Sequence, residues 1–316
     1  MNDAVDVSIC ILTHSQDELL RLCVESCVRE IKTSGLVTEV IIIDNASVNG
    51  APQRVSAPLR QVRVLRNEEN LGFSAAYNRA IGVTRGAYIL VLNDDVVLQP
   101  GSLGLMMKKL ESDPKIGALG PLLLSPEGPP QIGHTNLRFP HLRGVLCPYL
   151  KLDGFFDRWA TTRSLFTLRM DLTRSQDADH ICGACLVLRR EALDVVGLFD
   201  ERFHYYFEDA DLCYRMKRAG WRVFYLSEAH VIHYGSATSK ALGSLRIRLV
   251  FLRSLIYYFK KHSSRLRYYA LRLGLALIFA ARVPLAAVLA LFPRTRHDRN
   301  ELVRRSYVTL RFLIFD

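Results

Sequence analysis

The chain has 316 residues, of which 49% are hydrophobic and 23% charged, and these proportions exclude a disordered or fibrous protein. The net charge of +11 is concentrated in residues 241–316, which contain 15 Lys and Arg against 3 Asp and Glu. Residues 1–240 contain 27 Lys and Arg against 28 Asp and Glu, and this near-neutral balance argues against a nucleic-acid-binding protein. No basic region followed by an apolar core opens the sequence, so we expect a cytosolic protein whose seven cysteines are reduced.

The first 111 residues alternate between strand and helix patterns. Short apolar runs predict strands at 7–12, 39–43, 61–65 and 88–92. Apolar residues at helical spacing predict helices at 18–32, 73–83 and 101–111. This order predicts an α/β protein with a mainly parallel, doubly wound sheet.

Residues 125–180 interrupt the alternation. Five prolines lie between Pro126 and Pro148, and a segment this long without a regular pattern is typical of a functional loop or lid. The alternation returns with predicted strands at 184–188 and 222–226 and predicted helices at 191–196 and 209–219.

The sequence Asn93-Asp94-Asp95 follows the predicted strand at 88–92. Asn and Asp are common turn residues, so an ordinary surface turn is one interpretation. Adjacent carboxylates repel unless a cation lies between them, and Mg²⁺ and Mn²⁺ accept oxygen ligands of this kind. A divalent-metal site is therefore the alternative.

Polar side chains follow all four strands of the first half. They are Thr13-His14, Asp44-Asn45, Asn67 to Asn70, and Asn93 to Asp95. Because parallel strands end at the same edge of a sheet, these side chains are expected to converge on a ligand site. Neither a G-x-G-x-x-G nor a G-x-x-x-x-G-K-[ST] motif is present, which favours a nucleotide whose phosphates are reached through a metal.

The helix predicted at 209–219 begins within an acidic cluster of Glu208, Asp209 and Asp211. Asp209 can serve as a helix cap, because the helix dipole favours a carboxylate there. Three acids within four residues exceed what a cap needs, so a general base is the alternative. Cys182 and Cys185 form a C-x-x-C pair without a second pair at zinc-site spacing, and we expect buried thiols there.

An ordered set of motifs resembles the inverting glycosyltransferases of family 2, in the branch often described as rhamnosyltransferases. The motifs are V-S-I-C-I-L-T-H, I-I-I-D-N-A-S, N-L-G-F-S-A-A-Y-N-R-A-I, L-N-D-D-V, G-A-C-L-V-L-R-R and F-D-E-R-F-H-Y-Y-F-E-D-A-D-L-C-Y-R. The resemblance covers about residues 5–240 and implies a GT-A fold. We expect a GT-A domain at 1–240, with a nucleotide-binding half at 1–124 and an acceptor-binding half at 125–240.

The resemblance also implies roles for individual residues. Asp209 matches the catalytic base, and Glu208 would support this base or the acceptor. The residues expected to bind the nucleotide-sugar donor are Thr13, His14, Asp44, Asn70, Gly72, Asn93, Asp94, Gly183 and Ala184.

The metal position of the family coincides with Asn93-Asp94-Asp95. Asp95 matches the main ligand of Mg²⁺ or Mn²⁺. Asn93 stands where the family motif has its first acid, so the resemblance does not decide whether Asn93 contacts the metal. His233 is expected to be a further ligand, in preference to His230; an ordinary loop histidine is the alternative.

Residues 241–316 are predicted to form a basic, apolar helical tail. Residues 273–292 are apolar except for Arg282 and Pro284, with arginines on both sides. Helices lying on the cytoplasmic membrane surface are the preferred interpretation; a membrane span and a soluble bundle or oligomer contact are the alternatives.

The combined expectation is sugar transfer from dTDP-rhamnose or a UDP-hexose to a hydroxyl of a lipid-linked glycan. Such an enzyme would take part in cell-surface polysaccharide assembly at the cytoplasmic face of the membrane. Two alternatives stay open, a nucleotidyltransferase and a non-catalytic sugar-binding scaffold.

Overall fold

The computed structural model describes residues 4–59, 61–131, 138–150, 171–235, 244–289 and 307–313. Two compact units make up the chain. The first comprises Met1–Phe139 and Arg169–Ala237, and the second comprises Pro140–Leu168 and Thr238–Asp316. Of the described residues, 140–150 therefore group with the tail, whereas the sequence places them in the acceptor-binding half expected at 125–240, and that role stays a prediction.

One sheet organises the first unit, and its described strands follow the order β3-β2-β1-β4-β8-β6-β9-β5, with β7 paired to β9. The strands are β1 (Val7–Thr13), β2 (Thr38–Asn45), β3 (Val62–Asn67), β4 (Tyr88–Asn93), β5 (Val96–Leu98), β6 (Ile116–Leu124), β7 (Gln176–Asp177), β8 (Cys185–Arg189) and β9 (Arg222–His233).

The strands β3, β2, β1 and β4 are parallel, as the sequence predicts. The chain moves outward from β1 to β3 and then returns to place β4 on the other side of β1. Such a reversal of strand order opens a crevice at the carboxyl ends of the two strands concerned, here β1 and β4. The strand β8 runs antiparallel to both β4 and β6, whereas β6 and β9 are parallel.

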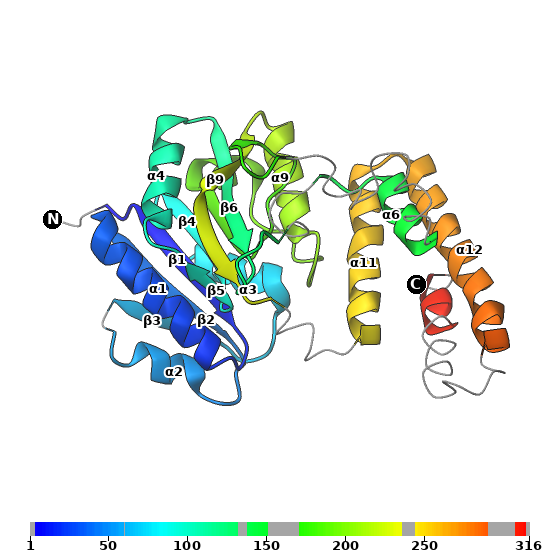
Figure 1. Ribbon diagram of the computed structural model, residues 1–316, viewed down its shortest axis with the longest axis horizontal. Coiled ribbons are helices and arrows are strands. Elements are labelled where there is room, and N and C mark those ends of the chain that lie inside the picture. Colours follow the sequence, from blue (N-terminus) through cyan, green and yellow to red (C-terminus); the bar gives the residue numbers. More distant parts are fainter. Residues whose placement is uncertain are drawn as a thin grey trace. The chain divides into compact units, whose positions relative to one another are not determined.

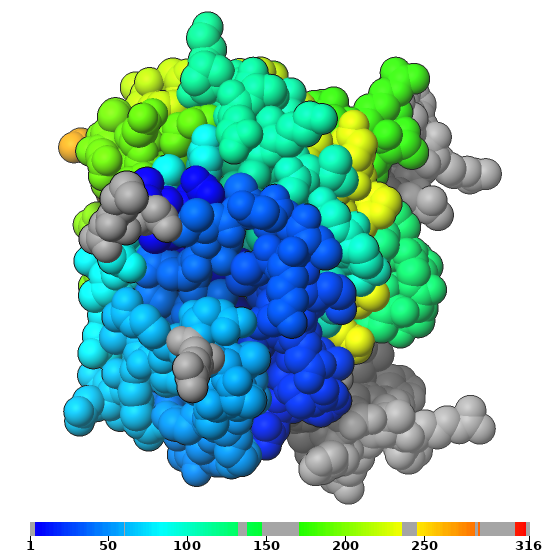
Figure 2. Space-filling model, turned by 90° about the vertical axis from the view of Figure 1, so that its left-hand side faces the viewer, coloured from blue at the N-terminus to red at the C-terminus, as the bar shows by residue number. Residues whose placement is uncertain are grey.

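Helices cover both faces of this sheet. They are α1 (Glu18–Ser34), α2 (Ala51–Ser56), α3 (Gly72–Ile81), α4 (Ser102–Ser112), α8 (Arg190–Val196) and α9 (Glu208–Arg218). Apolar residues of α1 and α4 pack on one face, and those of α3, α8 and α9 pack on the other (Figure 1). Figure 2 shows the part of the surface formed by the N-terminal elements, coloured in shades of blue. The two-layered helical covering confirms the doubly wound α/β prediction.

Three strands of this sheet, β5, β6 and the two-residue β7, escape the sequence pattern. The strand β6 contains Gly117, Gly120 and Pro121, residue types that are depleted in strands. The strand β5 has only three residues, which is too short for a periodic signal. The strands β5, β6 and β7 all pair with β9, so the second half of the sheet is wider than the sequence predicts.

The second unit is helical where it is described. It contains α6 (Leu142–Leu150), α11 (Ser244–His262) and α12 (Arg265–Leu289). The helix α6 packs on α12, where Gly274 leaves space for Leu146. The lid expected at 125–180 therefore includes a helix, while its residues 132–137 and 151–170 lie outside the described part. None of the helices in the described ranges is both long enough and apolar enough to cross a bilayer.

Candidate active site

The carboxyl ends of the parallel strands meet as predicted. Thr13 at the end of β1 is in register with Asp44 at the end of β2, and Asn45 is in register with Asn67 at the end of β3. On the other side of β1, Leu12 is in register with Asn93. Thr13 is buried, and its side chain faces Asp94, whose charged form it stabilises.

Asp44 is a fully buried carboxylate at this edge. Its oxygens accept hydrogen bonds from the Ser47 backbone (2.8 Å), from Gln53 Nε2 (3.2 Å) and from Arg66 Nη1 (2.5 Å). Burial opposes ionisation, but these donors outweigh it and lower the pKa of Asp44 below its ordinary value. Asp44 is thus a fixed negative charge beside the half-exposed guanidinium of Arg66.

An amide network holds the loop that leads into α3. Asn45 Nδ2 donates to Asn70 Oδ1 at 2.9 Å, and Asn45 Oδ1 accepts from Asn67 Nδ2 at 3.0 Å. Asn70 Oδ1 also accepts from the Gly72 backbone at 3.0 Å and from Tyr205 Oη at 3.2 Å. The structure therefore links Asn70, which the sequence predicts for donor binding, to Asn45 at the end of β2, and adds Tyr205 from a distant segment.

Gly72 is required at the start of α3 for two reasons. Its φ of +78° is unfavourable for residues with a side chain. A Cβ there would lie 2.4 Å from His204 Nδ1 and 2.7 Å from the His204 carbonyl oxygen. The amide of Phe73 donates to this carbonyl at 2.9 Å, so the segment around residue 204 rests directly on the start of α3.

Asp94 and Asp95 are buried at the switch between β1 and β4. The Asp94 amide donates to the Leu12 carbonyl at 3.2 Å, which fixes the turn after β4 against the end of β1. Burial raises the pKa of Asp94 to about 7, and the neighbouring Asp95 adds to this rise. Two carboxylates in one buried turn are electrostatically unfavourable in the absence of a cation.

Asp95 and His233 lie together, as the sequence predicts for a metal site. The pairing of β5 with β9 sets Val96 opposite His233, and Asp95 Oδ1 is 3.5 Å from His233 Nε2. Asp95 Oδ1 is buried and accepts no hydrogen bond from a described residue. The other ring nitrogen, His233 Nδ1, is 2.7 Å from Gln131 Oε1.

This arrangement fits a divalent ion. A metal-bound histidine usually has its second ring nitrogen held by a hydrogen bond, which Gln131 provides here. The described residues include no group of three or more His, Cys, Asp and Glu placed to enclose a metal. Mg²⁺ is commonly held by one or two protein ligands and by substrate phosphates, so Asp95 and His233 would suffice for an ion shared with a diphosphate.

The acidic pair Glu208 and Asp209 begins α9, after Tyr206 and Phe207 in left-handed backbone conformation. Left-handed residues with side chains are strained, and such strain is common at functional sites. Asp209 is half-buried, and its Oδ2 accepts a hydrogen bond from the Gly183 amide at 2.9 Å. Burial raises the pKa of Glu208 well above its ordinary value, and the nearby charge of Asp209 adds to this effect.

Gly183 and Ala184 connect the acidic pair with the turn after β4. The Gly183 amide binds Asp209, and the carbonyl of Ala184 accepts a hydrogen bond from the Asn93 amide at 3.0 Å. A Cβ on Gly183 would lie 2.9 Å from the ring of Phe73, so only glycine permits this close approach. Two adjacent backbone groups therefore set the spacing between Asp209 and the turn that carries Asp95.

The remaining predicted residues take less central positions. His14 is exposed, and its Nδ1 lies 2.8 Å from the Asn45 carbonyl oxygen. Cys182 and Cys185 are free thiols, and burial raises the pKa of each. Gln131 was not predicted, because it lies in the proline-rich segment and carries no motif.

The comparisons with known proteins agree with this geometry. The family model described as "Glycosyl transferase family 2" matches residues 8–197. The chain belongs to glycosyl transferase family 2. The match contains the strands β1 to β4, the turn with Asp95 and the Gly183-Ala184 segment, whereas Asp209 and His233 lie beyond it.

One relative of this family 2 protein is the N-acetylglucosaminyl-diphospho-decaprenol L-rhamnosyltransferase of Mycobacterium tuberculosis (strain CDC 1551 / Oshkosh). It is 33% identical over 222 residues, which cover 65% of this chain and 71% of the relative. This likeness confirms the predicted resemblance to rhamnosyltransferases of the family.

Two solved structures share the fold. One is the mannosyltransferase PcManGT from Pyrobaculum calidifontis in complex with GDP-Man and Mn²⁺, with a TM-score of 0.57 and 14% identity over 98% of this chain and 88% of that one. The other is GalNAc-T7 with UDP, GalNAc and Mn²⁺, with a TM-score of 0.57 and 16% identity. The match to GalNAc-T7 covers 74% of this chain but only 44% of that structure. The predicted GT-A fold is thereby confirmed.

Proposed function

We propose that this family 2 glycosyltransferase moves a sugar from a nucleotide-sugar donor to a hydroxyl group of a lipid-linked glycan, with inversion at the anomeric carbon. The observation that carries this proposal is the backbone link through Gly183 and Ala184. This link holds a half-buried carboxylate, Asp209, at a fixed distance from the turn that carries Asp95. A base and a site for a leaving diphosphate are the two parts that a single displacement needs.

The base would be Asp209. Its carboxylate would accept the proton of the acceptor hydroxyl while that oxygen forms a bond to the anomeric carbon. The bond from the anomeric carbon to the donor phosphate breaks on the opposite face, and its electron pair leaves with the nucleoside diphosphate. Attack opposite the leaving group inverts the configuration.

The donor would lie along the carboxyl ends of the parallel strands. Asp44 is ionised and buried, which suits hydrogen bonds from the hydroxyl groups of a ribose or the N–H groups of a base. His14, Thr13 and Asn70 border the same edge. The diphosphate would then extend along the switch between β1 and β4 toward Asp94 and Asp95.

A divalent ion, Mg²⁺ or Mn²⁺, would be held by Asp95 Oδ1 and His233 Nε2, and when bound it supplies positive charge beside the departing diphosphate. Burial of both side chains supports this assignment, because charge interactions are stronger where water is excluded. Asn93 would hold the turn through its backbone, and whether its side chain joins the site depends on the donor.

The donor is proposed to be dTDP-rhamnose or a UDP-hexose, and the acceptor a glycan on a prenyl diphosphate. The M. tuberculosis relative supports a rhamnosyl donor and a lipid-linked acceptor, because its name specifies rhamnosyl transfer and a diphospho-decaprenol acceptor. A lipid-linked acceptor would place the enzyme at the cytoplasmic face of the membrane, in cell-surface polysaccharide assembly. The basic helical tail would then contact the membrane surface or a second copy.

A panel of nucleotide sugars tests this function. The purified chain is incubated with each donor and Mn²⁺, and the release of nucleoside diphosphate is measured with and without a prenyl-diphosphate-linked glycan. We expect one donor to be consumed faster when the acceptor is present. Absence of turnover with every donor, combined with retained nucleotide binding, would favour the non-catalytic scaffold instead.

A further inference from the structure

A pocket of about 460 Å³ lies within the second unit, between α11 and the helical residues 307–313. This volume is within the range of small-ligand sites, which is roughly 300–1,000 Å³. The segment 307–313 is held to α12 by a hydrogen bond from Arg272 Nη2 to the Leu313 carbonyl oxygen, at 2.8 Å. The helix α11 also packs on α12, so both walls of the pocket contact the same helix of this unit.

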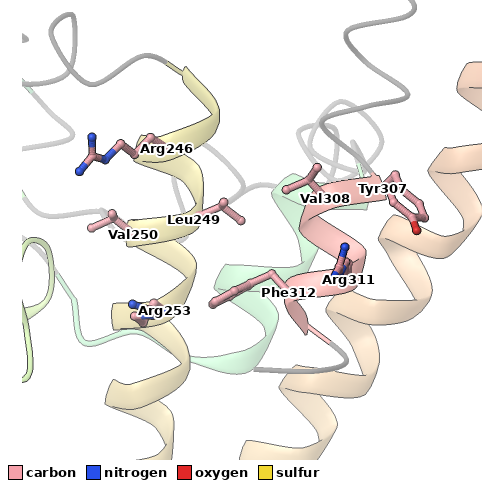
Figure 3. Close-up of a pocket in the computed structure, with 8 residues that line it drawn as sticks. All are labelled: Arg246, Leu249, Val250, Arg253, Tyr307, Val308, Arg311 and Phe312. Atoms are coloured by element: carbon pink, nitrogen blue, oxygen red, sulfur yellow. The ribbon is translucent and has the colours of Figure 1, made fainter.

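The walls of this pocket are largely apolar. Leu249 and Phe312 point toward one another across the space, and Val308 extends from the same segment as Phe312 (Figure 3). All three are half-buried, so part of their apolar surface is open to solvent. Such a surface favours a ligand that contributes a hydrocarbon portion.

Three arginines, Arg246, Arg253 and Arg311, also line the pocket, and all three are exposed. Arg253 and Arg311 lie on either side of Phe312 in Figure 3, and the Arg253 guanidinium carbon is 5.8 Å from the centre of the Phe312 ring. The described residues of this unit, 140–150, 244–289 and 307–313, contain no Asp or Glu that could neutralise them. The pocket therefore combines apolar walls with a concentration of positive charge.

We propose that this pocket binds the diphosphate end of a prenyl lipid, with the chain against Leu249 and Phe312 and the phosphates against Arg253 and Arg311. The guanidinium group binds phosphate oxygens in pairs, which suits this role. A bilayer phospholipid with one phosphodiester brings a single negative charge, whereas a diphosphate brings more charge to the three guanidinium groups. The inference rests on the proposed function, because the same kind of lipid would carry the acceptor glycan.

The test is direct binding of farnesyl diphosphate to the full-length protein by equilibrium dialysis, in EDTA so that no metal at Asp95 can bind the diphosphate. We expect farnesyl diphosphate to bind about 10-fold or more tightly than farnesol or inorganic pyrophosphate, because each of those supplies only half of the contacts. Short-chain phosphatidylglycerol should compete at least about 10-fold less effectively than farnesyl diphosphate. Equal competition by phosphatidylglycerol would overturn the diphosphate assignment in favour of a general anionic-lipid site.

The double variant Arg253→Gln with Arg311→Gln should weaken binding about 10-fold or more. The matched control is Arg265→Gln with Arg267→Gln, two exposed arginines on α12 outside the pocket, which changes the net charge equally and should alter binding less than about 2-fold. Equal losses in both double variants would overturn the pocket and leave only non-specific charge attraction. Because no donor is present, failure of this binding is distinguishable from failure of the proposed transfer reaction, which the nucleotide-sugar panel measures.

Discussion

The two acids at the start of α9 should respond differently to replacement by the corresponding amide. Asp209 accepts a hydrogen bond from the Gly183 amide, and it is the proposed base. Burial raises the pKa of Glu208 well above its ordinary value of 4.5, which favours the protonated carboxyl. The substitution Asp209→Asn removes the carboxylate that the reaction uses, whereas Glu208→Gln replaces a carboxyl whose protonated form is favoured by a neutral amide of the same shape.

The expected magnitudes follow from these states. A general base contributes a rate factor of about 10² to 10⁴, so Asp209→Asn should lower kcat by this factor. At about 1.4 kcal/mol for each factor of ten, the loss corresponds to ~3 to 5.5 kcal/mol of transition-state stabilisation. Glu208→Gln should keep kcat within roughly 3-fold of the wild type, a difference of less than about 1 kcal/mol.

The assay measures nucleoside diphosphate release with the donor and acceptor that the panel identifies, at pH 7, after circular dichroism has verified folding. Glu191→Gln, an exposed acid in the first turn of α8, is the control for loss of a surface charge. The reasoning is refuted if Asp209→Asn retains more than about a tenth of the wild-type kcat. It is also refuted if Glu208→Gln is as slow as Asp209→Asn, because Glu208 would then be ionised or reacting.

A stability measurement checks the same protonation state independently. The folded protein keeps the Glu208 proton at pH values where the unfolded chain has lost it, so the free energy of unfolding should fall as pH rises above about 4.5. Glu208→Gln removes this group and should flatten that part of the urea-unfolding profile. An unchanged profile would contradict the raised pKa.

The other predictions concern the donor edge and the metal pair. Hydrogen bonds outweigh burial and lower the pKa of Asp44, so the stabilisation that its carboxylate gives is present above the ordinary value of 3.8 and is lost as pH falls through the lowered pKa. Asp44→Asn should cost ~1.5 to 3 kcal/mol in urea unfolding at pH 7, and this cost should decrease as pH falls below 3.8. Gly72→Ala should lower the free energy of unfolding by about 2 kcal/mol or more, because the added Cβ meets His204. Gly101→Ala is the control: its φ is similar but no atom lies within 4 Å of the added Cβ, so the loss should be only ~1 kcal/mol. Equal losses in thermal unfolding would contradict the steric argument. His233→Ala should weaken Mn²⁺ binding in the presence of UDP about 10-fold or more by electron paramagnetic resonance, and His230→Ala, which removes an exposed side chain, should not; a similar loss in both would refute the assignment.

The sequence predicts well which polar residues share the carboxyl edge of the parallel strands, because its signals are local. Each parallel strand is a short apolar run that ends in polar residues, and parallel pairing alone brings Thr13, Asp44 and Asn93 to one edge. The family resemblance adds the role of Asp209, which local pattern alone leaves open between a cap and a base. These predictions rest on neighbouring residues or on motif order.

The parts that the sequence does not predict depend on distant contacts. Gly120 argues against a strand at β6, yet a Cβ there would lie 2.0 Å from Ile181 Cγ2, so close packing between segments requires this glycine. Gln131 is 102 residues from His233, and no local pattern links the two side chains. The pocket beside α11 likewise depends on residues 307–312, which lie about 60 positions after the α11 residues that they face.

The antiparallel strand β8 has a consequence for how the active site assembles. Tyr88 of β4 pairs with Arg189 of β8, and β8 must enter between β4 and β6 before Gly183 and Ala184 can reach Asp209 and Asn93. The edge formed by β1 to β4 involves residues that all precede position 94, so it can form early during synthesis. Contacts between distant segments form slowly because closing long loops is entropically costly. We therefore expect nucleotide-binding competence to appear before catalytic competence during refolding, with insertion of β8 as the step that separates them.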